Sequence, residues 1–404
     1  NTGETNLSVT GVTRSSGSSY FTVQNWSGTI TPGGVRVLQA TYTPGAAGNH
    51  TATMRIQSND PDEPNVYIPL EGDGGAAVPI HVDKTYDGSG GPPDGSPARP
   101  FTTIEDAMQA APRTCPTMTV VMVHSGVYVE SVNYYGKCIQ LQSVNGPDQT
   151  IIQDPTGTAI AAAVDMNLDT ATNWTPSLIG FTVMGVDSPY CVDLGGSHVV
   201  NANIQNVKFT GACGTGLMMR GLGTTGTVQN STFNLTGAGA VGALCTQQAT
   251  MTIQNNVFTN TATAFRVPDE GDCGAMGVTE FVNNVVTGSS VAGVDVGGAA
   301  STYNDYLTIA NNTLYGNVIG IRVDTDFAGA VSLFNNIIQG TAIGQTGIFV
   351  ESTGAMPEIY NNDVWAALGI PFSRYGGNIP DLTGLTGNIS VNPQFVNAAG
   401  GDFH

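Results

Sequence analysis

Apolar and polar residues alternate in seven short phrases of the chain, which recur at intervals of 24 to 28 residues. Each phrase holds an asparagine at one fixed place, and a short polar turn and a second apolar strand follow it. These asparagines are Asn206, Asn230, Asn255, Asn283, Asn311, Asn335 and Asn361, and Gly180 takes the same place in an eighth phrase. Short strands repeated at this period predict a solenoid in which each repeat forms one coil.

The fixed place of the asparagines predicts how neighbouring coils are held together. A side-chain amide both donates and accepts hydrogen bonds, so asparagines stacked from coil to coil can satisfy one another. We therefore expect these seven asparagines to form a ladder at the bends. The pattern predicts an all-β chain dominated by a right-handed parallel β-helix, because parallel crossovers are almost always right-handed.

The first part of the chain has a different pattern. Strands recur every 10 to 15 residues between Pro-Gly and Asn-Asp-Pro turns, which predicts a small β-sandwich. A linker that includes the sequence DGSGGPPDGSPARP follows. The predicted organisation is a β-sandwich over residues 1–74, a Gly/Pro linker over 75–100, the β-helix with a capping helix over 101–365, and a closing segment over 366–404.

One short helix is predicted at the start of the coils. In the sequence PFTTIEDAMQAAP, Thr102 and Glu105 have the spacing of a capping box, and Pro112 ends the helical pattern. Its apolar residues share one face, which suits a helix that covers the open end of the solenoid. These residues are Ile104, Ala107, Met108 and Ala111.

The six cysteines fall into neighbouring pairs that are separated by about one coil. Residues one coil apart stack at about 4.8 Å, which is close to the Cα separation that a disulfide requires. We therefore predict the disulfides Cys115–Cys138, Cys191–Cys213 and Cys245–Cys273. Six cysteines allow many other pairings, and unpaired thiols stacked in the core are the alternative. Disulfides would indicate an oxidising compartment outside the cytoplasm.

Charge and composition narrow the range of partners. The net charge is −19, with only 12 Lys and Arg residues in the chain, so the basic patches that nucleic-acid binding needs are missing. No apolar run reaches the roughly 18 residues that a membrane span takes. We expect an extracellular or cell-surface protein whose partners are other copies of itself or an extracellular polysaccharide.

Charged residues at outward positions of the second strand are the strongest candidates for chemistry. Arg266, Asp295 and Arg322 occupy equivalent positions in successive coils. Stacking would place one carboxylate between two guanidinium groups, which could form a substrate groove with Arg266 or Arg322 as a base and Asp295 as an orienting acid or a calcium ligand. The alternative is an exposed row of ion pairs, each worth about 0.2–1 kcal/mol.

A second candidate site is a calcium site, because Asp269, Glu270 and Asp272 gather hard oxygen ligands in one loop. Their spacing is not that of an EF-hand, and a solvated acidic turn is the alternative. No other cofactor is expected, since no Cys/His cluster has zinc spacing. Six aromatic residues could stack on sugar rings, although their scatter along the sequence favours a place in turns or at the caps of coils. These residues are Tyr134, Tyr135, Trp174, Tyr190, Tyr360 and Trp365.

Two stretches of the chain resemble known families. The phrases YTP (42–44), SNDP (58–61) and PLEG (69–72) resemble the immunoglobulin-like module of the ASPM/SPD-2/Hydin type. The order PFTTIEDAMQAAP then TVVMVHSGVYVE resembles the opening of pectin-lyase-like β-helix proteins. The first resemblance implies an exported surface protein whose incomplete sandwich edge is open to a strand from another chain. The second implies the fold and leaves the activity open, since lyases, hydrolases, esterases and adhesins share it.

Two functions follow from these patterns. The first is an extracellular structural or adhesive surface protein, a rigid β-helix that polymerises into a filament by strand donation to the immunoglobulin-like module. The second is a secreted polysaccharide lyase or another carbohydrate-active β-helix enzyme. Scarce basic residues, and repeats without the phrases typical of polygalacturonases and pectin methylesterases, favour the first function over an enzyme.

Overall fold

The computed structural model describes most of the chain. The described residues are 1–43, 49–73, 79–112, 118–156, 161–167, 175–195, 201–221, 223–247, 249–268, 278–297, 306–324, 330–351, 356–366, 368–374 and 382–403. The chain divides into two compact units. The first comprises Asn1–Val78 with Pro116–Met118, and the second comprises Pro79–Cys115 with Thr119–His404. The finer boundaries predicted within these units stay predictions.

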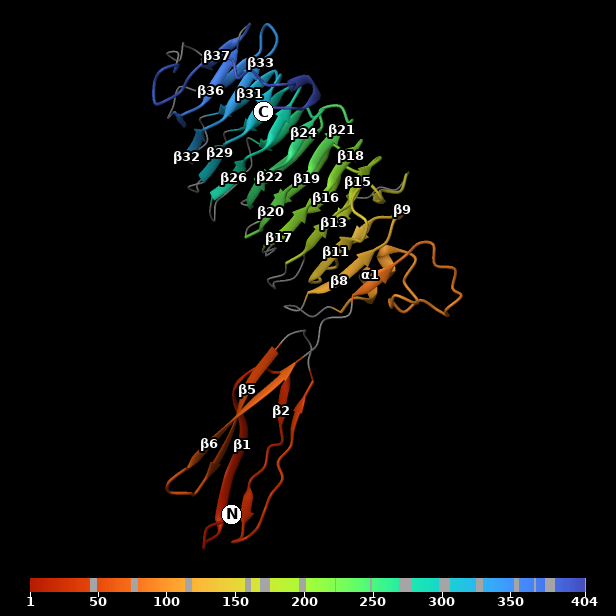
Figure 1. Cartoon of the computed structure of the whole chain (residues 1–404), viewed down its shortest axis with the longest axis vertical. Coiled ribbons are helices and arrows are strands. Elements are labelled where there is room, and N and C mark those ends of the chain that lie inside the picture. Colours follow the sequence, from red (N-terminus) through yellow and green to blue (C-terminus); the bar gives the residue numbers. More distant parts are fainter. Residues whose placement is uncertain are drawn as a thin grey trace. The chain divides into compact units, whose positions relative to one another are not determined.

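The first unit is a small antiparallel sandwich (Figure 1). Its strands are β1 Leu7–Gly17, β2 Phe21–Val23, β3 Gly28–Ile30, β4 Ala40–Tyr42, β5 Asn49–Ser58 and β6 Asn65–Asp73. One sheet has the strand order β3-β1-β5-β6, and β2 pairs with β4 in the other. Val9, Val12 and Met54 are buried in the core of this unit. Val9 and Val12 are three residues apart and share a face of β1 because the register shifts between Val9 and Gly11.

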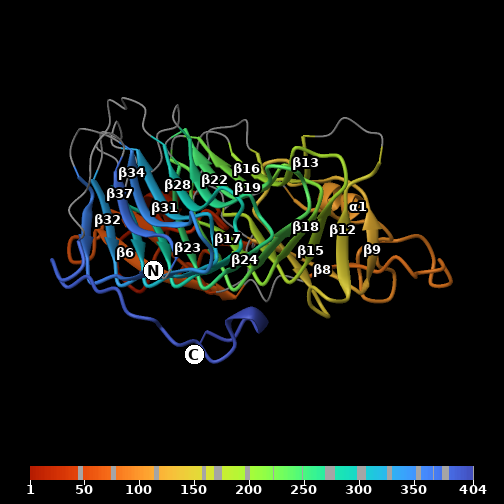
Figure 2. The same ribbon diagram turned by 90° about the horizontal axis from the view of Figure 1, so that it is seen from above.

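The second unit is a coil of parallel strands arranged in three sheets. Figure 2 shows equivalent strands of successive coils lying side by side. Alternate residues along the strands point inward and form one continuous core, because side chains of a strand point to opposite faces in turn. The predicted all-β class and the parallel β-helix are confirmed.

We refer to the three sheets by number. Sheet 1 contains β7 Ile80–Val82, β8 Thr119–Val123, β11 Ile139–Ser143, β14 Ser177–Ile179, β17 Ala202–Gln205, β20 Thr225–Gln229, β23 Thr250–Gln254, β26 Val278–Val282, β29 Tyr306–Ala310, β32 Ala330–Phe334 and β35 Glu358–Tyr360. Sheet 2 contains β9 Gly126–Val129, β12 Thr150–Gln153, β15 Thr182–Gly185, β18 Lys208–Gly211, β21 Thr232–Leu235, β24 Val257–Thr259, β27 Val285–Thr287, β30 Thr313–Tyr315, β33 Ile337–Gly340 and β36 Asp363–Ala366. Sheet 3 contains β10 Val132–Asn133, β13 Ala162–Asp165, β16 Tyr190–Leu194, β19 Thr215–Arg220, β22 Val241–Thr246, β25 Thr263–Val267, β28 Ala292–Val296, β31 Ile319–Asp324, β34 Thr346–Glu351 and β37 Ile370–Arg374.

Stacked aromatic rings fix the register of the coils from inside. Phe209, Phe233 and Phe258 occupy equivalent inward positions of β18, β21 and β24. Their ring centroids are 4.2 and 4.4 Å apart, and all three side chains are fully buried. A slip of one residue would turn this stack outward, so burial of the rings holds each strand to one alignment.

The bends between sheets 1 and 2 explain why asparagine recurs in the sequence. The bend residues are Asn206, Asn230, Asn255, Asn283, Asn311, Asn335 and Asn361, and all are exposed, with φ between 52° and 57°. Gly180 has a φ of 79° at the equivalent place. Glycine and asparagine tolerate this left-handed conformation better than other residues. The backbone therefore selects these asparagines, and their predicted role as the stacked ladder is wrong.

The buried ladder lies one residue further along the chain. Its members are Asn256, Asn284, Asn312, Asn336, Asn362 and Asn388. The backbone N and Nδ2 of Asn284 both donate to Asn312 Oδ1, at 2.9 and 3.2 Å, and Asn312 Nδ2 donates to Asn336 Oδ1 at 3.0 Å. Asn312 Nδ2 also donates to Phe281 O at 2.8 Å. The expected satisfaction of amides from coil to coil is thus present, displaced by one residue.

The helix α1, Ile104–Ala110, begins one residue later than the predicted capping box implies. Thr103 is the N-cap residue, and its hydroxyl accepts a hydrogen bond from Asp106 N at 3.1 Å. The predicted pairing of Thr102 with Glu105 is therefore wrong by one position. The predicted apolar face is buried, and it consists of Ile104, Ala107, Met108 and Ala111. This face packs against the first coils, where α1 contacts β7, β8 and β10; Figure 1 shows α1 next to β8.

Two charged side chains hold both ends of α1. The Glu130 carboxylate accepts hydrogen bonds from the first two backbone N–H groups of the helix, at 3.0 and 2.8 Å. Burial raises the pKa of Glu130. Lys137 Nζ donates to three carbonyl oxygens at the other end, at 2.6, 2.8 and 2.8 Å. Both side chains complement backbone groups that a helix leaves unpaired at its ends.

The predicted disulfide between Cys191 and Cys213 is present, and it joins neighbouring coils with the two Cα atoms 5.6 Å apart. Cys138 and Cys245 are disulfide-bonded as well. Their predicted partners, Cys115 and Cys273, lie outside the described residues, so these two pairings stay predictions.

The closing segment carries the 3-10 helix η1, Ala398–Gly400. Phe395 and Phe403 flank it and pack against Tyr315 of β30, with ring centroids 6.2 and 5.7 Å from that of Tyr315. These aromatic contacts fasten the segment to sheet 2. Within the described residues, the helices are too short and too polar for any of them to cross a membrane.

Candidate functional site

The outward face of sheet 3 carries a row of side chains in register. The row consists of Asn133, Asp165, Asp193, Met218, Leu244, Arg266, Asp295, Arg322 and Phe349. Because parallel strands align equivalent residues of successive coils, groups far apart in sequence become neighbours here. Met218 and Leu244 separate two charged clusters within the row.

The first charged cluster brings together the three predicted catalytic residues. Arg266 Nε lies 3.6 Å from Asp295 Oδ2, and Arg322 Nε lies 3.4 Å from Asp295 Oδ1. Arg322 Nε also lies 3.0 Å from Glu351 Oε2. The Asp295 side chain is 8% exposed, whereas that of Arg266 is 43% exposed. Each guanidinium faces a carboxylate, as in the expected row of ion pairs, and the lyase role of these residues stays a prediction.

The second charged cluster is a buried ion pair that the sequence analysis missed. Arg220 donates to both carboxylate oxygens of Asp193, from Nε at 3.2 Å and from Nη2 at 2.6 Å. Asn167 Nδ2 also donates to Asp193 Oδ2, at 2.8 Å. The Asp193 side chain is 0% exposed. Bidentate pairing and the amide hydrogen bond therefore offset the cost of removing this carboxylate from water.

Asp165 lies in register with Asp193, one coil before it. Asp165 Oδ1 accepts a hydrogen bond from Asn167 N at 2.8 Å, and Asn133 Nδ2 donates to Asp165 Oδ2 at 3.3 Å. Burial raises the pKa of the Asp165 carboxyl, and the charge of Asp193 raises it further. A carboxyl with a raised pKa beside an ionised one is an arrangement that acid–base catalysis can use.

Asp165→Asn is expected to stabilise the β-helix unit more at pH 7 than at pH 4. The folded-state pKa of Asp165 lies above its ordinary value of 3.8, so the wild type loses stability as the pH rises through the folded-state pKa. Asparagine cannot ionise and keeps an oxygen for the Asn167 N–H. Urea unfolding at both pH values measures the difference. A gain of the same size at pH 4 and pH 7 would contradict the prediction.

The predicted calcium ligands Asp269, Glu270 and Asp272 lie outside the described residues. Across the part of the chain that the structure describes, no group of three Asp, Glu, His or Cys side chains is placed to hold a metal ion. The calcium site at this loop therefore stays a prediction.

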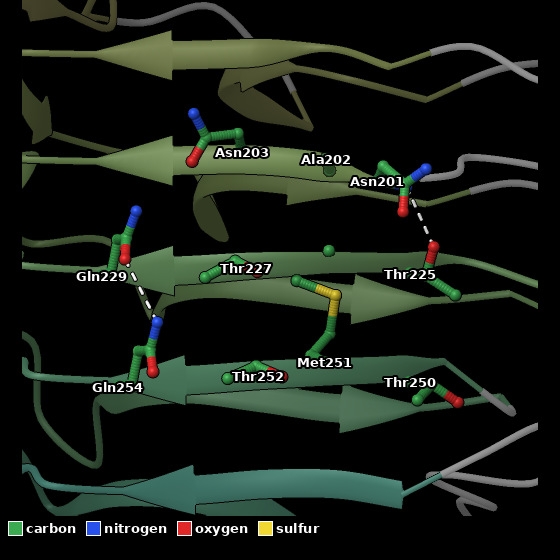
Figure 3. Close-up of a pocket in the computed structure, with 11 residues that line it drawn as sticks. Asn201, Ala202, Asn203, Thr225, Thr227, Gln229, Thr250, Met251, Thr252 and Gln254 are labelled. Atoms are coloured by element: carbon green, nitrogen blue, oxygen red, sulfur yellow. Dashed lines mark hydrogen bonds between the residues drawn. The ribbon is translucent and has the colours of Figure 1, made fainter.

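A shallow groove crosses three strands of sheet 1 (Figure 3). It has a volume of about 560 Å³ and lies over β17, β20 and β23. The lining residues are Asn201, Ala202, Asn203, Thr225, Gly226, Thr227, Gln229, Thr250, Met251, Thr252 and Gln254. None of them is charged, and most carry a hydroxyl or an amide. The groove therefore offers neutral hydrogen-bonding groups.

Strand register aligns similar side chains across the groove. Asn203, Thr227 and Thr252 lie side by side on the outward face. Gln229 and Gln254 form the next column, in which Gln254 Nε2 donates to Gln229 Oε1 at 3.1 Å (Figure 3). An amide has two N–H donors and two lone pairs, so this bond leaves capacity on both side chains. The groove can hydrogen-bond a ligand that is rich in hydroxyl groups.

Family comparisons agree with this architecture. Residues 170–366 match the model of the family described as right handed beta helix region, and residues 1–73 match the HYDIN/CFA65/VesB-like, Ig-like domain. The chain is a right-handed parallel β-helix protein with an N-terminal immunoglobulin-like domain. Both resemblances indicated by the sequence are thus confirmed. No curated protein matches the chain.

Solved structures similar to this β-helix protein include a polygalacturonase and two pectin methylesterases. The family 28 exopolygalacturonase of Yersinia enterocolitica is 10% identical, with a TM-score of 0.39 and 84% of each chain covered. The pectin methylesterase from carrot is 14% identical, with a TM-score of 0.34, over 79% of this chain and 90% of that one. A mutant pectin methylesterase in complex with a hexasaccharide is 12% identical, with a TM-score of 0.41, over 78% and 92%. Similarities of this size say nothing about the activity of the β-helix protein.

The repeats of this β-helix protein held signals for the residues that the sequence analysis missed. Asp165 lies 28 residues before Asp193, which is one coil, so the two could have been aligned. The groove has its own signal in the triplets TGT at 225–227 and TMT at 250–252, which place hydroxyls at equivalent outward positions of neighbouring coils. Both signals appear only after the coils are aligned strand by strand.

Proposed function

We propose that this chain is an extracellular adhesive protein that binds an uncharged polysaccharide in the groove of sheet 1. The observation that carries the proposal is the regular array of hydroxyl and amide groups without any charge in the groove lining. Such groups can donate to and accept from sugar hydroxyls at many points. The groove volume of about 560 Å³ falls within the range of small-molecule sites.

The charge of the protein favours a neutral ligand over an acidic one. The net charge is −19, and the Glu280 carboxylate accepts a hydrogen bond from Thr252 Oγ1, at 3.2 Å, beside the groove. A polyuronate in the groove would bring its carboxylates near that of Glu280. Salt screens charges only beyond about 10 Å, so this repulsion would persist in the medium outside a cell.

An extracellular location is part of the proposal, and the Cys191–Cys213 disulfide supports it. Disulfides persist in oxidising surroundings and are rare in the cytosol. A β-helix with polar side chains repeated along one face also suits adhesion, because a regular sheet presents binding groups at fixed spacing.

Polymerisation into a filament is a separate proposal. Within the described residues, β3 and β6 form the two edges of the four-stranded sheet. Val35 and Val37, in the chain between β3 and β4, are 87% and 80% exposed. Edge strands and exposed apolar residues of this kind can pair with a strand from another copy. Adhesion through the groove does not require this contact.

Hydrolysis of a polysaccharide is a second candidate function, and the register of Asp165 with Asp193 favours it. Arg220 holds the Asp193 carboxylate, while Asp165 carries the raised pKa that suits a proton donor. The complete burial of the Asp193 side chain weighs against direct contact with a substrate. Release of reducing ends by the wild type, lost in Asp165→Asn, would favour hydrolysis over adhesion alone.

Asn203→Ala and Gln229→Ala are each expected to weaken binding to a neutral polysaccharide by up to about tenfold. Each change removes hydrogen bonds to the ligand, and one such bond contributes about 0.5–1.5 kcal/mol. Sedimentation with insoluble glucan, mannan and xylan measures the binding, and polygalacturonate serves as the acidic polymer.

The matched control is Gln140→Ala. Gln140 lies in the same outward column as Asn203, two coils before it, and outside the groove. Its amide also donates to a neighbouring glutamine, Gln142. Binding by this variant should equal that of the wild type. Equal losses in Gln140→Ala and Gln229→Ala, or a wild type that binds no neutral polymer, would contradict the proposed function.

A further inference from the structure

The outward column that contains Gln229 and Gln254 continues along sheet 1 beyond the groove as apolar residues. The outward column of Gln229 and Gln254 extends through β26, β29, β32 and β35. Its further members are Val282, Ala310, Phe334 and Tyr360. Polar amides therefore give way, along one line, to small apolar side chains and then to two aromatic rings.

The two aromatic rings form a stacked pair on the outer surface. The centroids of Phe334 and Tyr360 are 5.0 Å apart, and their planes differ by 5°. Leu333 and Ile359, which precede them, point into the core and are buried, so the aromatic side chains point outward. Both rings are half-buried and leave apolar surface for a ligand.

A polar column runs beside the apolar one over the same strands. Its members after the groove are Glu280, Thr308, Ser332 and Glu358. Ser332 Oγ donates to Glu358 Oε2 at 3.1 Å, as Thr252 does to Glu280. A sugar ring has an apolar face and a rim of hydroxyls, so an apolar column beside a polar one matches both of its surfaces.

We infer that an extended, uncharged polysaccharide lies across the strands of sheet 1, from the groove to the Phe334–Tyr360 pair. The inference rests on the proposed function and names its ligand as a polymer. From β17 to β35 there are six steps between neighbouring strands, or about 29 Å at the usual strand spacing. A polysaccharide that places one sugar on each coil would need about seven sugars to extend from β17 to Tyr360 on β35.

The experiment compares a trisaccharide with a heptasaccharide, both cut from β-linked glucan, mannan and xylan. Isothermal titration calorimetry gives the Kd of each for the wild type, Tyr360→Ala and Tyr360→Leu. The wild type is expected to bind the heptasaccharide at least tenfold more tightly than the trisaccharide. Both variants should lose most of this gain and keep the Kd of the trisaccharide, which does not reach the aromatic pair.

The control variant is Tyr67→Ala, which removes a 59% exposed tyrosine from β6 in the other unit. It should leave both dissociation constants unchanged. Two results would overturn the inference and leave groove binding intact. One is that the wild type binds both oligosaccharides with equal affinity, and the other is that Tyr360→Ala and Tyr360→Leu still bind the heptasaccharide as much more tightly as the wild type does. Failure of the wild type to bind either length would overturn the proposed function as well. Trisaccharide binding by each variant verifies that it is folded.

Discussion

Replacing Arg220 by alanine is expected to lower the free energy of unfolding of the β-helix unit by about 3–5 kcal/mol. The Asp193 side chain is fully buried, and Arg220 supplies both of its charged hydrogen bonds. Without the guanidinium, the carboxylate keeps only the amide of Asn167 among its described partners. Urea unfolding followed by circular dichroism at pH 7 measures the loss.

Arg266→Ala is the matched control for this prediction. Arg266 belongs to the same outward row, its side chain is 43% exposed, and its Nε lies 3.6 Å from Asp295. Its loss should cost about 0–1 kcal/mol, since Arg322 still faces Asp295. The double variant Arg220→Met with Asp193→Leu should recover much of the stability, because no buried charge remains. If Arg220→Ala and Arg266→Ala lower the free energy of unfolding equally, burial of the Asp193 carboxylate is not what makes the loss of Arg220 costly.

Asn312→Ala is expected to destabilise the β-helix unit by about 2–5 kcal/mol, since each buried polar group left unpaired costs about 1–3 kcal/mol. Asn312 Oδ1 accepts two hydrogen bonds from Asn284. Its Nδ2 donates to Phe281 O and to Asn336 Oδ1. Alanine removes all four contacts from the middle of the ladder. The same urea titration measures the loss, and hydrogen exchange at Asn284 N reports whether the neighbouring coil opens.

The preceding residue provides a control at the same bend. Asn311 is exposed with a φ of 57°, and glycine adopts that conformation without strain. Asn311→Gly should therefore change stability by less than about 0.5 kcal/mol. If Asn311→Gly costs as much as Asn312→Ala, the assignment of the ladder to the second asparagine is wrong.

The sequence period was sufficient to predict the fold but not to place each side chain. Alternation of apolar residues identified the strands, because a buried face needs a period of two. At the bend, adjacent asparagines such as Asn311 and Asn312 serve different physical needs, and a repeat pattern shows only that both recur. Gly180 is the clue that separates the two roles. It occupies the place equivalent to Asn311, and glycine can adopt a left-handed φ but has no side-chain amide for a ladder.

The candidate sites were predictable only where charge marked them. Arg266, Asp295 and Arg322 stand out in a chain with few basic residues, and the register of sheet 3 brings them together. The pairing of Asp193 with Arg220 was not predicted, because their side chains meet across strands from positions that are not equivalent. Most groove residues carry hydroxyl or amide groups at outward positions. An ordinary solvent-exposed strand has the same pattern, so sequence alone did not distinguish the groove from the rest of the surface.

The Cys191–Cys213 bond has a mechanical consequence. Coils of a solenoid contact only their neighbours, so a force on the chain ends would peel them away one at a time. The bond spans 22 residues in sequence. At 3.3–3.6 Å per residue, this loop has a contour length of roughly 70–80 Å, which cannot extend while the bond is intact. Under load, the chain extends less while this bond is oxidised than after reduction, so the redox state of the medium sets how far it can stretch.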